Sequence, residues 1–356
     1  MTTHAHLVLA DGTVYRGQIF GESNPVMGEV VFNTSMTGYQ EMLTDPSYAG
    51  QIVMPTYPLI GNYGINLDDN ESSRIQVAGF IVREHSLQPS HYNSIFTLEE
   101  YLKEQGITGI SNLDTRAVTR RIRSTGVMMG IITTEDPAEA LGRLKVANSY
   151  DSMDLVQSVS TQESYEWESS GASKRIIVMD FGVKYNILRS LSKRGCAIRI
   201  LPPTATAEEI MSFHPDGVLF SPGPGDPMHN QIAIRTAKNL IGTLPIMGIC
   251  LGHQIVSIAM GATTYKLKFG HRGGNHPVQD LTTNRIYITA QNHGYAVSDN
   301  NLPPELKVTH RNINDETIEG IRHIGLPIMT IQYHSEASPG PLDNDYIFDD
   351  FIDMTS

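Results

Sequence analysis

The sequence predicts an α/β protein with an N-terminal α+β domain and a C-terminal domain whose mostly parallel sheet is flanked by helices. Two observations lead to this prediction. Residues 157–173 are rich in Ser, Gln and Glu and poor in aliphatic residues, so they are interpreted as a linker. After this segment, strand-like and helix-like segments alternate, which is typical of a parallel sheet. The expected domains are therefore residues 1–156 and 174–356, both of ordinary domain size.

Short alternating segments separated by turn residues open the N-terminal domain. The Asp11-Gly12 pair favours a hairpin between the first two expected strands. Thr97 is expected to cap a helix. The expected strands are residues 6–9, 13–17, 29–33, 51–57 and 77–82, and the expected helices are residues 97–105 and 114–125.

Apolar and β-branched residues at 175–180 (RIIVMD) indicate the first strand of the C-terminal domain, buried on both faces. Helical and strand-like segments then follow in turn. The expected strands are residues 175–180, 197–201, 217–220 and 245–249, and the expected helices are residues 185–194, 207–213, 232–241 and 251–260. In sheets of this kind the active site lies beyond the carboxyl ends of the strands.

The composition limits the possible function classes. The 356 residues include 26 Lys and Arg and 38 Asp and Glu, and the net charge of −12 disfavours nucleic-acid binding. The basic run at Arg120, Arg121 and Arg123 is interpreted as a solvated helix face or a partner contact. Two cysteines provide no disulfide framework and indicate a reducing compartment. With neither a signal peptide nor an apolar run of about 18 residues, we expect a cytoplasmic protein without membrane segments.

Cys250 is the strongest candidate for a catalytic nucleophile. An expected strand ends at this residue, a helix begins directly after it, and Gly248 and Gly252 flank it. Small residues at these positions permit a sharp turn that holds a nucleophile above the sheet, and the helix N-terminus stabilises a thiolate. The backbone N–H of Leu251 would then face a developing oxyanion. A buried structural cysteine is the alternative, whereas a zinc site with His253 lacks further ligands at suitable spacing.

His334 and Glu336 are the candidates for a proton shuttle and its orienting carboxylate. An expected strand at residues 328–333 ends at His334, and residues two apart in an extended chain point to the same side. Together with Cys250 they predict a Cys-His-Glu triad. For His334 alone, a surface histidine is an open alternative. For Glu336 alone, a solvated carboxylate or a turn cap is an open alternative. Cys196 lies at a helix-to-strand junction and is interpreted as structural.

Two polar segments are candidates for the substrate pocket. Residues 221–227 (SPGPGDP) follow an expected strand, lack the Lys and spacing of a Walker A loop, and can present backbone N–H groups. The second oxyanion donor is expected there, and an ordinary rigid turn is the alternative. Residues 290–295 (AQNHGY) are interpreted as a polar break after a strand at 285–289. A metal at His271 and His276 is disfavoured, because no acidic ligand accompanies them.

Several motifs resemble those of the triad-type (class I) glutamine amidotransferases. These motifs are GICLGHQ (248–254), SPGPGDP (221–227) and YHSEASPGP (333–341). Further motifs narrow the resemblance to the carbamoyl phosphate synthetase small-subunit family, and they are KFGHRGGNHPV (268–278), QNHGYAV (291–297), GEVVFNTSMTGYQEMLTDPSY (28–48), YPLIGNYG (57–64) and LDTRAVTRRIRSTG (113–126). The last three lie in the N-terminal domain, so the resemblance covers essentially the whole chain except the linker.

This resemblance implies roles for individual residues. Cys250 would form a γ-glutamyl thioester, His334 would act as general base and acid, and Glu336 would orient His334. The residues that would hold glutamine are Ser47, Gly223, Gly225, Leu251, Gln254, Asn292, Gly294 and Tyr295. The chain departs from the family at Tyr295, where relatives often have Phe, and at Ser335, where many have Pro.

The function implied by the resemblance is that of the glutamine-hydrolysing subunit. It would convert L-glutamine to glutamate and ammonia and pass the ammonia through a tunnel to a large subunit. That subunit would make carbamoyl phosphate from bicarbonate and ATP, for arginine or pyrimidine biosynthesis or both. This chain would hold no cofactor or metal, ATP and Mg²⁺ would bind the large subunit, and the two subunits would form a heterodimer or higher oligomer. A free-standing glutaminase or γ-glutamyl hydrolase, and a non-catalytic glutamine-binding regulatory subunit, are the alternatives.

Overall fold

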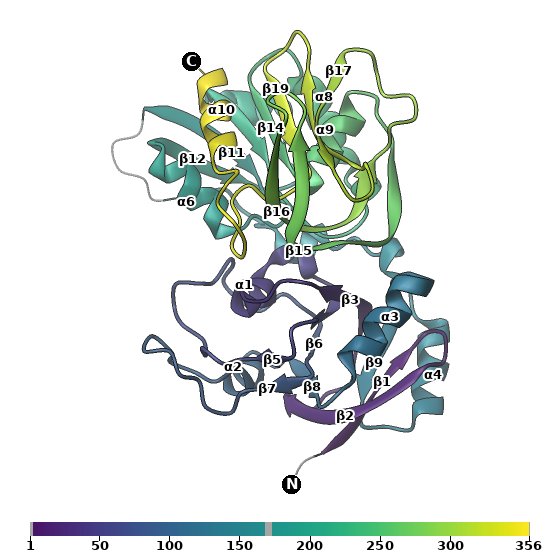
Figure 1. The fold of residues 1–356 in the computed structure, drawn as a ribbon. Helices are drawn as coiled ribbons and strands as arrows, with labels where there is room; N and C mark the ends of the chain where they lie inside the picture. Colours follow the sequence, from purple (N-terminus) through teal and green to yellow (C-terminus); the bar gives the residue numbers. More distant parts are fainter. Residues whose placement is uncertain (1–2, 168–172, 356) are drawn as a thin grey trace. The chain divides into compact units, whose positions relative to one another are not determined.

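The chain consists of two compact units, Met1–Met153 and Asp154–Ser356 (Figure 1). The computed structural model describes residues 3–167 and 173–355. None of the helices in these two ranges combines the length and the apolar composition that a membrane span requires.

Part of the segment interpreted as a linker has secondary structure and belongs to the second unit. It contains α5 (Val156–Val159) and β10 (Tyr165–Trp167), and β10 pairs antiparallel with β12 (Cys196–Leu201). Residues 168–172, also within the expected linker, lie outside the described residues. A polar composition therefore did not prevent this segment from adding an edge strand to a sheet.

A closed β-barrel forms the centre of the first unit, in the strand order β1-β2-β8-β6-β4-β3-β9. The barrel strands are β1 (His4–Leu9), β2 (Val14–Gly21), β3 (Val26–Asn33), β4 (Gln51–Pro55), β6 (Gly79–Ile81), β8 (Thr108–Ser111) and β9 (Met128–Thr133), and a separate parallel pair consists of β5 (Leu59–Ile60) and β7 (Glu84–His85). Each strand expected from the sequence is present. The barrel closes through two strands that were not expected, because β8 joins β2 to β6 and β9 joins β1 to β3.

Capping residues define where the helices of the first unit begin. Thr97 accepts a hydrogen bond from Glu100 N and donates its own N–H to Glu100 Oε2, which makes a capping box. Asp114 accepts from Ala117 N at the start of the next helix. The helices are α1 (Tyr39–Thr44), α2 (Leu98–Glu104), α3 (Thr115–Thr125) and α4 (Pro137–Val146), with short 3₁₀ turns η1 (Pro46–Tyr48) and η2 (Tyr150–Ser152). Of these, α2 and α3 confirm the two expected helices.

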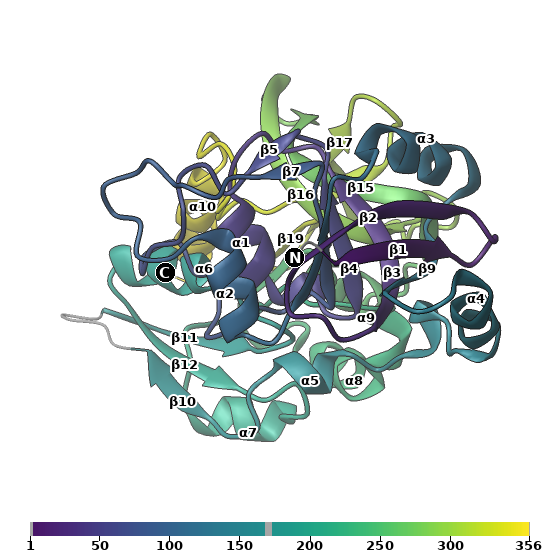
Figure 2. The same ribbon diagram turned by 90° about the horizontal axis from the view of Figure 1, so that it is seen from below.

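A ten-stranded sheet forms the centre of the second unit, in the order β10-β12-β11-β13-β14-β19-β18-β17-β15-β16. The strands not yet bounded are β11 (Lys174–Met179), β13 (Gly217–Phe220), β14 (Ile246–Ile249), β15 (Thr264–Asp280), β16 (Arg285–Val297), β17 (Leu306–Asn312), β18 (Ile318–His323) and β19 (Ile328–Ile331). The central strands from β12 to β19 pair parallel, and antiparallel pairs extend the sheet on both sides. Figure 2 shows β10, β12 and β11 side by side. The predicted α/β fold class is confirmed.

Helices cover both faces of this sheet, as expected. Alternate residues of β11 enter different apolar cores: Ile176 and Val178 pack with α6 and α10, whereas Ile177 and Met179 pack with α7, α8 and α9. The helices are α6 (Tyr185–Lys193), α7 (Ala207–Ser212), α8 (Gln231–Leu240), α9 (Leu251–Ala259) and α10 (Tyr346–Met354), with a 3₁₀ turn η3 (Pro227–His229).

Three neighbouring parallel strands, β13, β14 and β19, lead directly into the predicted site segments. Residues 221–227 follow β13, Cys250 follows β14, and the segment with His334 follows β19. Because β14 pairs with both β13 and β19, their carboxyl ends meet at the same edge of the sheet. The fold therefore brings these segments together, as expected for an open α/β sheet.

The polar break predicted at residues 290–295 is wrong, because β16 continues without interruption through these residues. They pair with β15, and His293 lies opposite His271 across the ladder. Polar side chains fit inside this strand because they bond to one another, as in the pairs of Gln291 with His271 and with Thr289. The polarity of the segment therefore reflects a buried hydrogen-bond network.

Candidate active site

Cys250 lies between β14 and α9 in a strained backbone conformation. Its φ of 53° and ψ of −106° place it in the left-handed half of conformational space, which non-glycine residues rarely adopt. The backbone N–H of Cys250 donates to Ile331 O at 2.9 Å, and its carbonyl accepts from Gln254 N at 3.2 Å. These contacts hold the residue in a nucleophile-elbow conformation, where strain of this kind is typically found.

Glycines on both sides of Cys250 allow the elbow to form. A Cβ on Gly252 would lie 2.0 Å from Phe220 O, and a Cβ on Gly248 would lie 2.6 Å from Gly252 O. Gly252 also donates its N–H to Ser221 O at 3.1 Å, which connects the elbow to the loop after β13. The sequence-based reason for small residues at these two positions therefore agrees with the packing.

The Cys250 sulfur lies between the β16 backbone and the His334 imidazole. Cys250 is 2% exposed, and its thiol donates to Asn292 O at 3.6 Å. Burial lowers the pKa of the His334 ring, whereas the charges of Glu336 and Cys250 raise it, and His334 Nε2 is buried without a hydrogen-bond partner among the residues that the structure describes. The structure thus brings the candidate nucleophile and the candidate base together.

His334 and Glu336 form a fully buried pair. His334 Nδ1 lies 2.6 Å from Glu336 Oε1, so this nitrogen carries a proton, and the opposite nitrogen, Nε2, has no hydrogen-bond partner among the described residues. The extended backbone assumed for this segment is wrong: β19 ends at Ile331, and Ala337 N donates to His334 O at 3.1 Å in a turn. The two side chains therefore meet across a turn instead of along a strand.

Lys184 is a site residue that the sequence analysis missed. Its Nζ lies 3.2 Å from Glu336 Oε1 and donates to Ala337 O at 2.5 Å, while Asn186 donates to Glu336 O. Lys184 precedes α6 and is 2% exposed. A lysine that directly follows the strand-loop segment DFGV was the signal available in the sequence, but nothing there indicates its partner.

The charges of this buried group act on one another. Burial alone lowers the pKa of His334, but the charges of Glu336 and Cys250 outweigh burial and raise this pKa above the usual 6.5. Burial alone raises the pKa of Glu336, but Lys184 and His334 outweigh it and lower this pKa below the usual 4.5. An ionised carboxylate and a protonated ring are therefore favoured, and such a ring can donate a proton to a leaving group.

The loop at residues 221–227 packs closely against the elbow. A Cβ on Gly223 would lie 2.2 Å from Phe181 O and 2.8 Å from Leu251 Cδ2, so glycine is required by space. Gly225 has a φ of 87°, which glycine adopts without strain. The hydroxyl of Ser221 accepts from Phe181 N at 2.9 Å and fixes the start of the loop. An oxyanion donor from this loop stays a prediction.

Most of the residues predicted to hold glutamine lie around Cys250. Gln254 Nε2 donates to Tyr295 O and to Gln332 Oε1, both at 3.0 Å. Asn292 accepts from the Cys250 thiol, as described above. Leu251 is the first residue of α9, and Gly294 lies between Asn292 and Tyr295 on β16. Their contacts with glutamine stay predictions.

Ser47 lies in the first unit and is described separately. It stands in η1, where its N–H donates to Asp45 Oδ1 at 2.9 Å. Its hydroxyl oxygen is buried and has no hydrogen-bond partner among the residues that the structure describes. This hydroxyl is therefore free to accept or donate one hydrogen bond, and its role in glutamine binding stays a prediction.

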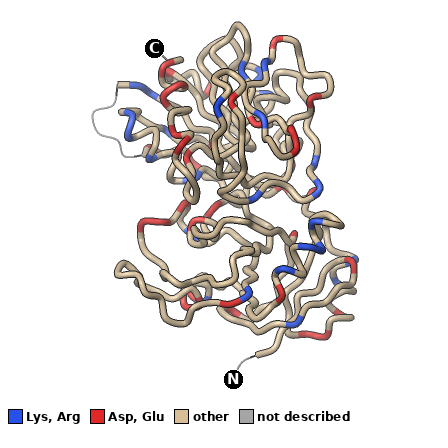
Figure 3. Tube along the Cα trace, viewed as in Figure 1, with Lys and Arg blue, Asp and Glu red and all other residues tan. Residues whose placement is uncertain are grey.

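The structure also shows where Cys196, His253 and the basic run on α3 lie. Cys196 is buried in the apolar core beside α6, where burial raises the pKa of its thiol to about 11. His253 is buried and bonds to Thr330 Oγ1 at 2.7 Å, and burial lowers its pKa to about 3. The basic run lies on α3 (Figure 3), where its exposed arginines line an open hollow of about 770 Å³.

Comparisons with known proteins find similar sequences over nearly the whole chain. The family model described as carbamoyl-phosphate synthase small chain, CPSase domain, matches residues 7–132, and the model of class-I glutamine amidotransferases matches residues 177–354. The carbamoyl phosphate synthase small chain of Bacillus caldolyticus is 52% identical over 349 residues, which cover 97% of this chain and 95% of that protein. The small chain of Chlorobaculum tepidum is 49% identical over 355 residues, which cover 98% and 97%. That of Listeria monocytogenes serotype 4b is 50% identical over 351 residues, which cover 98% and 96%.

Proposed function

The chain belongs to the family of carbamoyl phosphate synthase small chains, and from this premise we propose that it hydrolyses glutamine through Cys250, His334 and Glu336. The observation that carries this proposal is a buried imidazole that is bonded to Glu336 through Nδ1, has an unbonded Nε2, and has its pKa raised by the charge of Cys250 at a strained elbow. This arrangement matches the roles of a nucleophile, a proton shuttle and an orienting carboxylate.

In the first half of the reaction the Cys250 thiolate attacks the side-chain carboxamide carbon of glutamine. A carbon–sulfur bond forms, and the carbonyl electron pair moves onto oxygen, where the N–H of Leu251 and a donor near Gly223 stabilise it. Collapse of this intermediate breaks the carbon–nitrogen bond. His334 donates its proton to the departing nitrogen, so ammonia leaves and a γ-glutamyl thioester remains.

In the second half, water replaces ammonia at the same carbon. Neutral His334 takes a proton from the water as its oxygen adds to the thioester carbon. Collapse then breaks the carbon–sulfur bond, which releases the product as a γ-carboxylic acid and restores the thiolate beside a protonated ring. The acid loses its proton to solvent and becomes glutamate. Glu336 stays ionised throughout and keeps the ring oriented through the 2.6 Å hydrogen bond. The sum of both halves is glutamine plus water to glutamate, ammonia and a proton.

The relatives are named small chains, and this name implies a large chain as the partner of this protein. The large chain in this proposal binds ATP, Mg²⁺ and bicarbonate, and receives ammonia through a tunnel to make carbamoyl phosphate. The two chains assemble as a heterodimer or a multiple of it in the cytoplasm. The carbamoyl phosphate then serves arginine biosynthesis, pyrimidine biosynthesis or both.

A Cys250→Ser variant tests this proposal in the complex of small and large chains. Glutamine-dependent carbamoyl phosphate synthesis should fall to background, because a serine hydroxyl is a much weaker nucleophile at neutral pH. Ammonia-dependent synthesis should stay at the wild-type rate, because ammonia reaches the large chain without the thioester. Mass spectrometry of the wild-type small chain with glutamine should show a covalent γ-glutamyl adduct.

Cys196→Ala is the matched control, because Cys196 is buried in an apolar core outside the site. It should keep both activities. Glutamine-dependent synthesis that survives in Cys250→Ser would refute the assigned nucleophile. Equal loss of both activities would refute the division of labour, and high glutamine turnover without a large chain would favour a free-standing glutaminase.

A further inference from the structure

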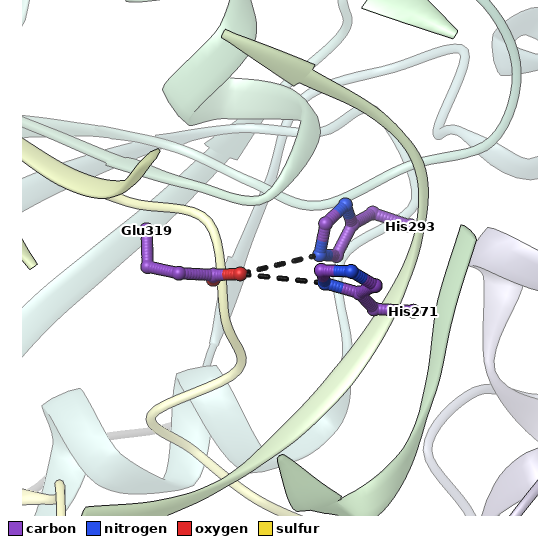
Figure 4. A group of neighbouring side chains, drawn as sticks. All are labelled: His271, His293 and Glu319. Carbon is purple, nitrogen blue, oxygen red and sulfur yellow. Dashed lines mark ion pairs between the residues drawn. The ribbon is translucent and has the colours of Figure 1, made fainter. Parts of the chain in front are cut away.

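Two histidines and a glutamate form a cluster on three strands of the sheet, β15, β16 and β18 (Figure 4). His271 on β15 and His293 on β16 are direct partners across the ladder, and Glu319 comes from β18. Glu319 Oε1 lies 3.4 Å from His271 Nδ1 and 3.9 Å from His293 Nε2. The three side chains are 8%, 1% and 0% exposed, so the cluster is buried.

The outer nitrogen of each ring has a hydrogen-bond acceptor that fixes its proton. His293 Nδ1 lies 2.8 Å from Tyr295 O, and His271 Nε2 lies 2.8 Å from Asp315 Oδ2. A carbonyl or carboxylate oxygen can only accept, so both outer nitrogens carry hydrogen. In the neutral rings, the inner nitrogens therefore present lone pairs toward Glu319. Carboxylate and carbonyl partners of this kind orient histidines that bind metals.

The centre of the cluster contains more acceptors than donors. Gln291 Oε1 lies 2.8 Å from His271 Nδ1 and 3.2 Å from His293 Nε2, so it adds a further acceptor to the two lone pairs and the carboxylate. Donors from Asn312 and Thr317 stand 3.4 Å from His271 Nδ1 and Glu319 Oε1, at the long limit of a hydrogen bond. Glu319 Oε2 is buried and has no hydrogen-bond partner among the described residues. A cation at the centre would satisfy these acceptors together.

We propose that His271, His293 and Glu319 bind a divalent transition-metal ion such as Zn²⁺, with Gln291 Oε1 as a fourth ligand. Imidazole nitrogens and a carboxylate are ordinary zinc ligands. At metal–ligand distances of about 2.1 Å, tetrahedral ligands stand about 3.4 Å apart. The four separations given above, from 2.8 to 3.9 Å, bracket this value, and all atoms of the His-His-Glu group lie within 4.8 Å of one another.

The position of Asp315 agrees with a cation at this place. Asp315 is 41% exposed and its Oδ2 lies 2.8 Å from His271 Nε2, so it connects the buried cluster to the part of the surface from which an ion would enter.

The metal would connect β15, β16 and β18, and one of its ligands, His293, directly follows Asn292 in the chain. The metal would have a structural role, because four protein ligands leave no vacant position for substrate. From the sequence, a metal was disfavoured because no acidic ligand accompanies His271 and His276. The fold supplies that acid from β18, and the second histidine is His293, while His276 stacks on His271 with ring centroids 5.1 Å apart.

Zinc binding to the full-length chain tests the proposal without reference to glutamine hydrolysis. The Cys250→Ser chain is used as the background, because a thiolate next to His334 could bind zinc on its own. After removal of metals with a chelator and addition of Zn²⁺, mass spectrometry should find about one zinc ion per chain after dialysis. Co²⁺ in place of Zn²⁺ should produce visible absorption of a four-coordinate site without a sulfur-to-cobalt charge-transfer band.

Variants in this background distinguish the site from general surface binding. Glu319→Gln keeps the shape of the side chain but removes the charge, and it should lose zinc in competition with a chelator that the parent chain withstands. Asp315→Asn should weaken binding by about 10- to 100-fold, as loss of an outer partner does. Glu305→Gln, an exposed glutamate before β17, is the matched control and should bind as the parent chain does.

Three results would overturn the proposal. The first is a parent chain that retains no zinc after dialysis, which would mean that the cluster does not bind a metal ion. The second is wild-type affinity in both Glu319→Gln and Asp315→Asn. The third is an unchanged cobalt spectrum in Glu319→Gln, which would place the ion elsewhere. Circular dichroism of the zinc-free variants checks that they fold. If Glu319→Gln does not fold, Asp315→Asn decides the question, because Asp315 is partly exposed and its replacement is easier to accommodate.

Discussion

Replacing Lys184 with methionine removes a positive charge from a buried carboxylate while keeping the length of the side chain. Lys184 Nζ lies 3.2 Å from Glu336 Oε1, and the two side chains are 3% and 0% exposed. Removal of one partner from such a pair costs about 3–5 kcal/mol in the free energy of unfolding, because the other charge stays buried. We expect Lys184→Met to lose stability in this range near neutral pH.

The loss of stability should depend on pH with a definite sign. In the wild-type chain, Lys184 and His334 outweigh the effect of burial and hold the pKa of Glu336 below its usual 4.5. An acid whose pKa is lowered on folding stabilises the chain above its unfolded pKa and loses this contribution as pH falls through the folded value. Without Lys184 the folded pKa of Glu336 rises. The difference in stability between wild type and variant should therefore be largest above about pH 5 and shrink as the solution is acidified.

Urea unfolding of the full chain at neutral and acidic pH measures this difference. Lys174→Met is the matched control, because Lys174 Nζ donates to Thr355 O at 2.7 Å on the neighbouring part of the same unit, outside the triad. In the complex, glutamine-dependent turnover of Lys184→Met should fall by roughly 10- to 100-fold, because the imidazole loses its fixed orientation. A loss of stability no larger than that of Lys174→Met, or one independent of pH, would refute the buried-charge argument.

Two further predictions concern the triad and the elbow. Glu336→Gln removes the charge that raises the pKa of His334, so glutamine-dependent turnover should fall by roughly 10³- to 10⁴-fold in steady-state assays; near-normal turnover would show that this carboxylate does not orient the ring. Gly252→Ala brings a Cβ to 2.0 Å from Phe220 O, a backbone atom that cannot rotate away, so urea unfolding should show a loss of at least about 1–3 kcal/mol. Gly142 lies in the middle of α4, and an added Cβ would meet no atom within 4 Å beyond its chain neighbours and the backbone of its own helix, so Gly142→Ala should raise the free energy of unfolding by about 0.5–1 kcal/mol. Equal effects of the two alanines would contradict the steric explanation.

Features whose signals lie within a few residues could be predicted from the sequence. The elbow is one, because the buried strand, Gly248, Cys250, Gly252 and the following helix are consecutive in the chain. The capped start of α2 at Thr97 is another. The alternation of strands and helices after the expected linker similarly indicated the parallel part of the sheet, because buried parallel strands are continuously apolar.

Features that depend on contacts between distant segments could not be predicted in this way. The short polar strand β8 carries little apolar signal, yet it helps to close the barrel. The break predicted at residues 290–295 is wrong because this segment pairs with β15 and the Gln291 side chain finds His271 there, which the local pattern does not reveal. His334 and Glu336 meet across a turn that the alternation rule did not anticipate.

By itself, the sequence determined the class of the fold, the position of the candidate nucleophile and the types of residue available for catalysis, because periodicity and flanking glycines are local properties. The tertiary structure alone decided which charges face one another. Lys184 is placed against Glu336 by the packing of the segment before α6, and Glu319 is placed beside His271 and His293 by the order of strands in the sheet. The physical reason is that side-chain pairing follows from strand order and register, which depend on the packing of the whole unit.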